Sequence, residues 1–173
     1  NIMQGYHNKP EQTKAVMTSD GGFRTGDRGW KDEDGFVYIT GRFKEEYKLE
    51  NGKYVHPASI EEDIKLLPFV SNAFVYGEGK PYNVSLIVPD EADLSDLGVS
   101  SIEELKNSPE VKSRMEEKIK DHLHETYGGY EIPKKFYILE EDFTVENQML
   151  TQTMKLKRRN IVDKYEQTLN ELY

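Results

Sequence analysis

Two apolar segments that lie close together in the sequence constrain the fold more than any other feature. Residues 70–76 and 82–88 are rich in β-branched, aromatic and aliphatic side chains, and a short stretch containing glycine and proline separates them. In the second segment, Val84, Leu86 and Val88 alternate with positions that we expect to be more exposed, which is the period of a half-buried strand. The pattern predicts two neighbouring strands joined by a loop.

Helical periodicity occurs on both sides of these strands. One helix is expected to begin at Pro57 and to end before Pro68, because proline fits the first turn of a helix but not its interior. A capping-box pattern, S-x-x-E at 101–104, predicts a short helix. A longer helix follows Ser108, and its apolar positions recur every four residues at Val111, Met115, Ile119 and Leu123. Another amphipathic helix is predicted for residues 156–173.

A further strand, predicted at 136–139, completes the C-terminal pattern. From residue 42 onward the sequence therefore predicts a compact α+β domain with an antiparallel or mixed sheet flanked by helices. Before it, a helix is predicted at 10–16, with Pro10 at its first position, followed by β-rich sequence.

The composition excludes several functional classes. A formal net charge of −9 argues against nonspecific binding to nucleic acid or to an anionic membrane surface. The absence of cysteine excludes disulfides and thiolate metal sites and fits a cytoplasmic protein. No apolar run is long enough to span a bilayer. His122 and His124 point to different faces of a predicted helix, so we predict no metal site.

The N-terminal part contains a candidate nucleotide site around a T-G-D sequence at 25–27. A carboxylate on a turn that glycine permits can accept two hydrogen bonds from a diol such as a ribose. Residues 28–31 and 35–40 are predicted to be short strands joined by an Asp-Gly turn. Asp27 and Arg42 would then lie at the two ends of one β-unit and face a shared cleft. The alternative is an ordinary hairpin with solvated charges.

A second hairpin is predicted a few residues later. Asn51 and Gly52 lie between two strand-like segments, 47–50 and 53–56, and Asn-Gly is the strongest signal for a two-residue hairpin turn.

Five short motifs occur in an order that is typical of one enzyme family. They are similar to G-Y-x-x-x-P-E-x-T at 5–13, T-G-D at 25–27, G-R-x-K-[DE] at 41–45, K-L-x-x-G-x-Y-V-x-P at 48–57 and N-x-x-L-T-P-T-x-K-x-K-R at 147–158. On these motifs the chain resembles the AMP-forming acyl-CoA synthetases of the adenylate-forming (ANL) superfamily. Within that superfamily it is most similar to the long-chain fatty acid branch.

The resemblance implies a two-step reaction in a full-length parent enzyme. A fatty acid and ATP, accompanied by Mg²⁺, would give acyl-AMP and pyrophosphate, and CoA would then accept the acyl group as a thioester. The family's serine/threonine/glycine-rich phosphate motif is absent here. We therefore expect residues 1–41 to end a large N-terminal AMP-binding domain and residues 42–173 to form the C-terminal lid domain, with a hinge near 41–45.

This organisation has consequences for substrates and location. Fatty acid, ATP and CoA would bind through the missing N-terminal domain, so the chain alone is expected to be inactive. The parent is expected to be cytoplasmic, either free or in peripheral contact with a membrane, and not to bind nucleic acid.

The resemblance also assigns roles to the nucleotide-binding and catalytic residues. Lys155 matches the family's catalytic lysine, which bridges the carboxylate substrate and the nucleotide phosphate. Asp27 matches the ribose-binding aspartate, with Thr25 in the same motif, and Arg42 matches an arginine that helps to hold the nucleotide. Lys157 and Arg159 are interpreted as part of a solvated basic face.

Two departures concern the loop that presents Lys155. Gln148 and Gln152 replace residues that are commonly glycine and proline in the related sequences, which predicts a more mobile loop.

Further roles by resemblance concern domain motion and the acceptor thiol. Lys44 falls at the hinge about which the C-terminal domain would swing between the two half-reactions. The hairpin residues would line the pantetheine tunnel in the second step, and they are Asn51, Gly52, Lys53 and Tyr54. A turn without such a role is the alternative.

Two other functions remain open. The chain could be a noncatalytic module that binds a partner protein, or part of an adenylating enzyme that loads a carrier protein instead of CoA.

Overall fold

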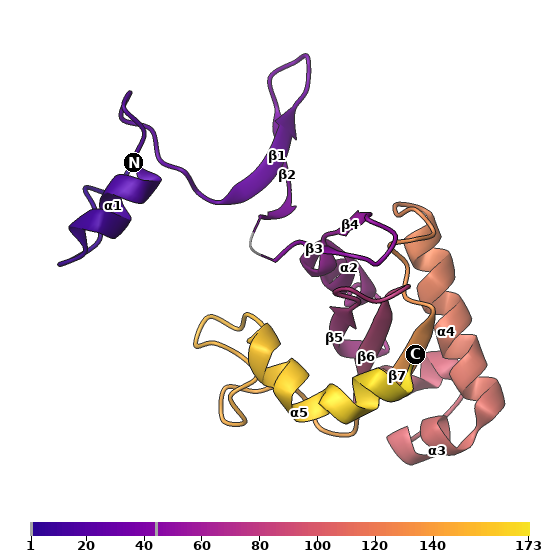
Figure 1. Cartoon of the computed structure of the whole chain (residues 1–173). Helices are drawn as coiled ribbons and strands as arrows, with labels where there is room; N and C mark the ends of the chain where they lie inside the picture. Colours follow the sequence, from indigo (N-terminus) through magenta and orange to yellow (C-terminus); the bar gives the residue numbers. More distant parts are fainter. Residues whose placement is uncertain (1, 44) are drawn as a thin grey trace. The chain divides into compact units, whose positions relative to one another are not determined.

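The computed structural model describes residues 2–43 and 45–173. The chain divides into two compact units, Asn1–Glu45 and Glu46–Tyr173, and each is described by itself (Figure 1). Lys44, which the sequence assigns to the hinge, lies outside the described residues.

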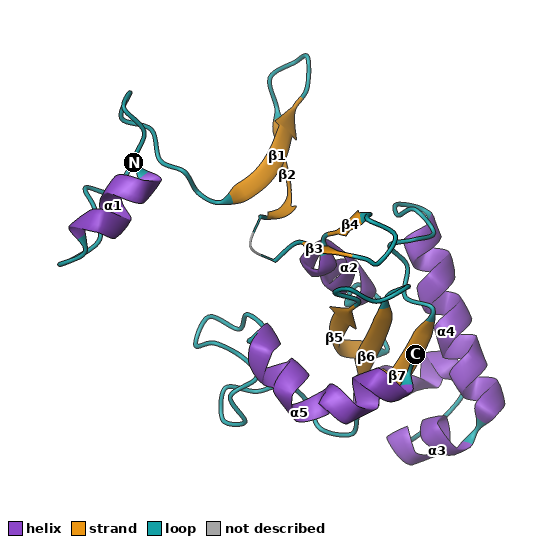
Figure 2. Cartoon of the chain, in the orientation of Figure 1, coloured by secondary structure: helices purple, strands orange, loops and turns teal. Residues whose placement is uncertain are grey.

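The first unit contains one helix and one β-hairpin (Figure 2). Helix α1 (Pro10–Val16) begins at a proline, as predicted, and buries no residue. Strands β1 (Asp27–Lys31) and β2 (Val37–Arg42) are antiparallel, with Asp27 opposite Arg42. The predicted pairing is confirmed, although β2 begins later than expected because the turn between the strands is longer.

Large apolar side chains are exposed on this hairpin. Trp30, Phe36, Val37 and Ile39 are each more than half exposed, at 55%, 67%, 66% and 66%. Trp30 stacks on Tyr38 with the ring centroids 4.4 Å apart, which shields part of both rings. Large exposed apolar side chains gathered on one hairpin are typical of a contact surface.

The second unit is built around a three-stranded mixed sheet. Its strands β5 (Val70–Tyr76), β6 (Val84–Pro89) and β7 (Lys135–Ile138) lie in the order β5-β6-β7. The β5 and β6 strands are antiparallel, whereas β6 and β7 are parallel. The predicted α+β class and mixed sheet are confirmed.

Helices cover both faces of this sheet and bury two separate apolar clusters. They are α2 (Pro57–Ile64), α4 (Pro109–His124) and α5 (Arg158–Glu171). The α2 and α4 helices pack against the face that contains Ile87, and α5 packs against the face that contains Leu86. Because both faces are covered, every residue of β6 is buried. The predicted exposure of its alternate positions is therefore wrong.

The predicted stripe of α4 is confirmed, since its four apolar residues are the ones that the helix buries. Before α4 the chain forms a 3₁₀-helix, η1 (Glu91–Leu97), which was not predicted, and α3 (Ile102–Asn107). The Ser101 hydroxyl caps α3 by accepting a hydrogen bond from Glu104 N at 3.2 Å. The Glu104 carboxylate accepts in return from Ser100 N at 2.8 Å, so the reciprocal half of the capping box is shifted by one residue.

The second hairpin differs from its prediction. Strands β3 (Tyr47–Lys48) and β4 (Tyr54–Val55) are antiparallel. Leu49 N donates to Lys53 O at 2.9 Å, so the loop between this pair contains three residues and the predicted two-residue turn is wrong. Gly52, the last residue of the loop, has a φ of +85°. Hairpin loops of three residues commonly end in this left-handed conformation, which favours glycine.

Candidate functional site

Thr25, Asp27 and Arg42 lie together in the first unit. Gly26 has a φ of +79°, which is the glycine-permitted turn that the sequence predicts. Thr25 Oγ1 accepts a hydrogen bond from Asp27 N at 3.1 Å, and Arg42 Nε lies 3.1 Å from a carboxylate oxygen of Asp27. The Asp27 and Arg42 side chains thus contact each other, which the predicted arrangement of two groups facing a shared cleft does not specify.

This pair retains binding capacity. Asp27 is 26% exposed and Arg42 is 52% exposed. An ionised carboxylate offers about four acceptor positions, so one contact with Arg42 leaves Asp27 able to accept from two hydroxyl groups. An ion pair at this level of exposure contributes little to stability, about 0–1 kcal/mol. The arrangement is therefore suited to holding a carboxylate in place for a polyol.

Lys155 lies on the rim of a tightly bonded loop in the second unit. Leu150 and Leu156 form an antiparallel bridge at its base. Thr151 spans the loop, because its N donates to Lys155 O at 2.8 Å and its Oγ1 accepts from Lys155 N at 3.1 Å. The Lys155 side chain is exposed, and its ammonium has no hydrogen-bond or carboxylate partner within residues 2–43 and 45–173. These bonds hold the backbone, in contrast to the more mobile loop that the sequence predicts, while the ammonium remains available.

The cations that follow Lys155 differ in their surroundings. Arg159 is 93% exposed, and its Nε lies 3.9 Å from the Asp163 carboxylate, which agrees with the predicted solvated face. Lys157 is half-buried, and its N donates to Met149 O at 2.7 Å.

Backbone strain flanks Lys155. Gln148 and Met154 have φ values of +61° and +60°, in the left-handed region that β-carbons disfavour. Asn160 Nδ2 donates to Gln148 O at 2.7 Å and helps to hold this conformation. Strain held by surrounding contacts is typical of functional loops.

We expect Gln148→Gly to raise the free energy of unfolding by up to about 1 kcal/mol, because glycine adopts the left-handed conformation without strain. The greater conformational entropy that glycine gives the unfolded chain offsets only part of this stabilisation. Urea unfolding of the chain measures this change. Glu146→Gly is the control, since Glu146 is exposed in the same loop without a positive φ. It should lower the free energy of unfolding, by about 0.5–1 kcal/mol. Equal losses in both variants would contradict the assignment of strain to Gln148.

Arg158 is a site residue that the sequence did not reveal. Its guanidinium forms an ion pair with Glu61 of α2, at 2.6 Å, although the two residues are 97 positions apart in the sequence. Glu61 is buried, with 3% of its surface exposed. The only feature of the sequence that points to Arg158 is its place at the start of a predicted helix, where the helix dipole disfavours positive charge. It indicates a compensating contact but not its partner.

The hairpin that carries Gly52 has an open tip. A β-carbon built at Gly52 would meet only Lys48 Cε, at 3.6 Å, which is ordinary contact. Asn51 Oδ1 accepts from Lys53 N at 3.0 Å and shapes the loop. Lys53 Nζ lies 4.3 Å from the centre of the Tyr130 ring. Tyr54 is 55% exposed, so the side chains around the tip are accessible to a ligand.

In the part of the chain that the structure describes, no group of three or more His, Asp or Glu side chains is arranged to hold a metal ion. Among the same residues, no helix has the length and apolar character needed to cross a bilayer.

The family follows from comparison with known sequences. The profile of the AMP-binding enzyme C-terminal domain matches residues 45–173. The chain therefore belongs to this family, which has the α+β fold described above.

Curated relatives match nearly the whole chain. The long-chain-fatty-acid–CoA ligase FadD15 of Mycobacterium tuberculosis is 34% identical over 99% of the chain and 30% of its own length. The fatty acyl-CoA synthetase A of Dictyostelium discoideum is 32% identical over 100% of the chain and 27% of its own length. The human long-chain-fatty-acid–CoA ligase ACSBG1 is 34% identical over 99% of the chain and 27% of its own length. The chain thus spans less than a third of the length of these relatives.

Solved structures show the same fold. The adenylation domain of a carboxylate reductase from Mycobacterium chelonae has a TM-score of 0.82 and 28% identity, over 98% of this chain and 26% of that one. The A-PCP didomain of a carboxylic acid reductase from Segniliparus rugosus, in complex with AMP, has a TM-score of 0.82 and 28% identity. It covers 99% of this chain and 23% of that one.

Proposed function

We propose that this chain is the C-terminal part of a longer, AMP-forming acyl-CoA ligase that acts on long-chain fatty acids. The named ligases support this proposal, since they match nearly the whole chain and the chain spans only 27–30% of their length. So does the exposed apolar hairpin of the first unit, since it offers a surface for contact with a larger domain. The reaction would form acyl-AMP and pyrophosphate from fatty acid and ATP, and then the CoA thioester.

The observation that carries the proposal is the Lys155 ammonium, which has no partner among the described residues and extends from a backbone held by hydrogen bonds to Thr151. A carboxylate that attacks the α-phosphate of ATP approaches a group of like charge. A cation held between them stabilises the charge that develops in the transition state, and it does not first have to break an ion pair with a carboxylate of the chain. Since the loop is bonded across Thr151, little reorganisation is needed when the substrates arrive.

For the nucleotide we propose that Asp27 accepts hydrogen bonds from the ribose hydroxyls. Arg42 would hold the Asp27 carboxylate in place through its contact at 3.1 Å, and Thr25 would hold the Asp27 backbone, because its Oγ1 accepts a hydrogen bond from Asp27 N at 3.1 Å. Because the described residues contain no cluster of metal ligands, a magnesium ion bound to ATP would be held by phosphates and by other parts of the enzyme.

For the acceptor we propose CoA, and a carrier protein is the competing reading. The hairpin tip at Gly52 gives a narrow thiol arm close access to backbone. Beside it, the Lys48 and Lys53 ammonium groups lie over tyrosine rings, and neither has a carboxylate partner within the described parts of the chain. Both could attract the phosphates of CoA. Lys44 and its neighbours would act as the hinge between the two half-reactions.

A chimera tests the function directly. In it, this chain replaces the segment of M. tuberculosis FadD15 to which it aligns. We expect the chimera to convert palmitate, ATP and CoA to palmitoyl-CoA, detected by mass spectrometry, whereas FadD15 truncated before that segment should not. A parallel reaction with a phosphopantetheinylated carrier protein distinguishes the acceptors. A folded chimera that binds ATP but makes no acyl product with either thiol would favour the noncatalytic alternative.

A further inference from the structure

We propose that the ion pair between Arg158 and the buried Glu61 is a positioning device for Lys155. The pair would set the place of the Lys155 ammonium and so influence acyl-AMP formation without touching the substrates. This inference rests on the role proposed for Lys155, and the experiment below separates the two.

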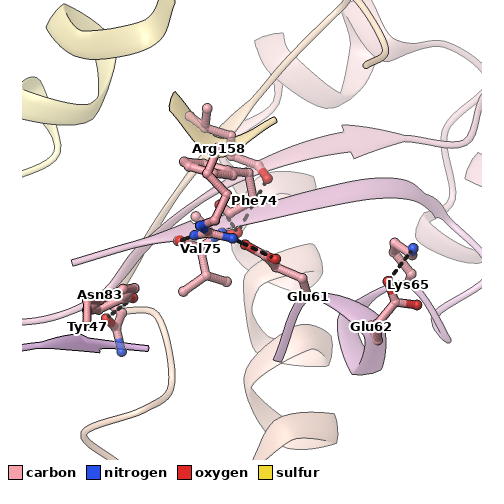
Figure 3. Close-up of polar contacts among 10 residues, drawn as sticks. Tyr47, Glu61, Glu62, Lys65, Phe74, Val75, Asn83 and Arg158 are labelled. Atoms are coloured by element: carbon pink, nitrogen blue, oxygen red, sulfur yellow. Dashed lines mark hydrogen bonds and ion pairs between the residues drawn. The ribbon is translucent and has the colours of Figure 1, made fainter. Parts of the chain in front are cut away.

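The Arg158 guanidinium contacts three residues, Glu61, Val75 and Phe74 (Figure 3). Its Nη1 donates to both carboxylate oxygens of Glu61, at 2.6 and 2.9 Å. Its Nη2 donates to Val75 O, and the guanidinium lies 4.5 Å from the centre of the Phe74 ring. Arg158 is the first residue of α5, Glu61 belongs to α2, and Phe74 and Val75 belong to β5. One side chain thus joins three elements.

Glu61 also contacts the backbone of β5. One of its oxygens accepts a hydrogen bond from Val75 N at 2.7 Å, so Val75 is bound at its N by Glu61 and at its O by Arg158. The Glu61 side chain is only 4% exposed. Buried ion pairs are weak contributors to stability compared with apolar packing of similar volume. Such a pair instead fixes the relative positions of the two side chains, because the planar guanidinium can donate to a carboxylate in only a few orientations.

Lys155 lies close to this anchor along the chain. Only Leu156 and Lys157 separate it from Arg158, and the backbone of both is fixed by the bridge from Leu150 to Leu156 and by the bond from Lys157 N to Met149 O. Three residues span at most about 11 Å when extended. A displacement of α5 would therefore displace Lys155 by a similar distance. Misplacement by about 1 Å can reduce a catalytic rate by about 100-fold.

The test compares half-reactions in the FadD15 chimera. We expect Arg158→Lys and Glu61→Gln each to slow acyl-AMP formation by about 10- to 100-fold, because each variant loses the contact of one guanidinium with both carboxylate oxygens. Both substituted side chains can still form hydrogen bonds, so the change in the fold should be small. Conversion of synthetic acyl-AMP and CoA to acyl-CoA should change by less than about threefold. Pyrophosphate exchange measures the first step, and circular dichroism confirms the fold of each variant.

Arg114→Lys is the matched control. Arg114 also contacts a carboxylate, Glu110 at 3.4 Å, and a carbonyl, Leu97 O at 2.9 Å, but it lies on α4. The same substitution there should leave both half-reactions unchanged.

A double-mutant cycle distinguishes positioning from an independent effect. If Arg158 acts through Lys155, adding Arg158→Lys to Lys155→Ala should cause no further loss of acyl-AMP formation. Additive losses, or equal losses of both half-reactions in Arg158→Lys, would overturn the inference. If Lys155→Ala slows acyl-AMP formation but Arg158→Lys and Glu61→Gln do not, only this inference fails. If Lys155→Ala itself has no effect, the role proposed for Lys155 fails as well.

Discussion

Replacement of Lys155 by alanine is expected to slow acyl-AMP formation in the FadD15 chimera by about 100- to 1,000-fold, the loss usual for one preorganised group that stabilises developing charge. The cause is the removal of a cation that the loop holds in place without a partner among the described residues. Pyrophosphate release in the absence of CoA, with hydroxylamine to trap the acyl-AMP, measures this step.

Lys157→Ala provides the control for this prediction. Lys157 lies two positions away and likewise has no carboxylate partner within the described residues, so it changes the local charge by the same amount. It should retain acyl-AMP formation within about threefold. Similar losses for the two variants would indicate a general effect of positive charge near α5 and would count against a specific role for Lys155.

Gly52→Leu is expected to have the opposite profile, with acyl-AMP formed at a near-normal rate and thioester formation slowed by about 100-fold. A leucine at the open tip of the hairpin would block the approach of the acceptor thiol. The substitution also places a β-carbon at a φ of +85°, which costs about 1–2 kcal/mol in stability. Acyl-CoA yield from supplied acyl-AMP measures the second step separately.

The strain and the blockage can be separated by Gly98→Leu. Gly98 has a φ of +79° and ends η1, so leucine there causes a comparable backbone cost. We expect this variant to lose stability but to keep both half-reactions. If Gly98→Leu and Gly52→Leu slow thioester formation equally, the hairpin has no special role in the second step.

Elements with strong local periodicity could be predicted from the sequence. The α4 stripe recurs every four residues over the helix, and the structure buries those same four side chains. Proline at the first position located the starts of α1 and α2. The side chains of β6 could not be assigned in this way, because a strand covered on both faces depends on helices far away in the sequence. The parallel pairing of β6 with β7 depends in the same way on the intervening segment.

The candidate site was predicted only in part, for related reasons. The contact between Asp27 and Arg42 follows from hairpin geometry, since the ends of paired strands meet. The mutual ion pair was not predicted, because the sequence indicates only that the two groups face a shared cleft. Arg158 and Glu61 could not be paired from local pattern, as nothing near either residue specifies the other. The loop of the second hairpin gained one residue because Leu49 pairs with Lys53, which the Asn-Gly signal does not specify.

The most direct test supplies synthetic acyl-AMP and CoA to the Lys155→Ala chimera and measures the rate of acyl-CoA formation. If this chain serves adenylation through Lys155 and the thiol step through the Gly52 hairpin, the variant should form acyl-CoA within about threefold of the unmodified chimera. It should do so even though it makes almost no acyl-AMP of its own. Loss of the thioester step to the same extent as adenylation, in a variant that remains folded, would contradict this division of labour.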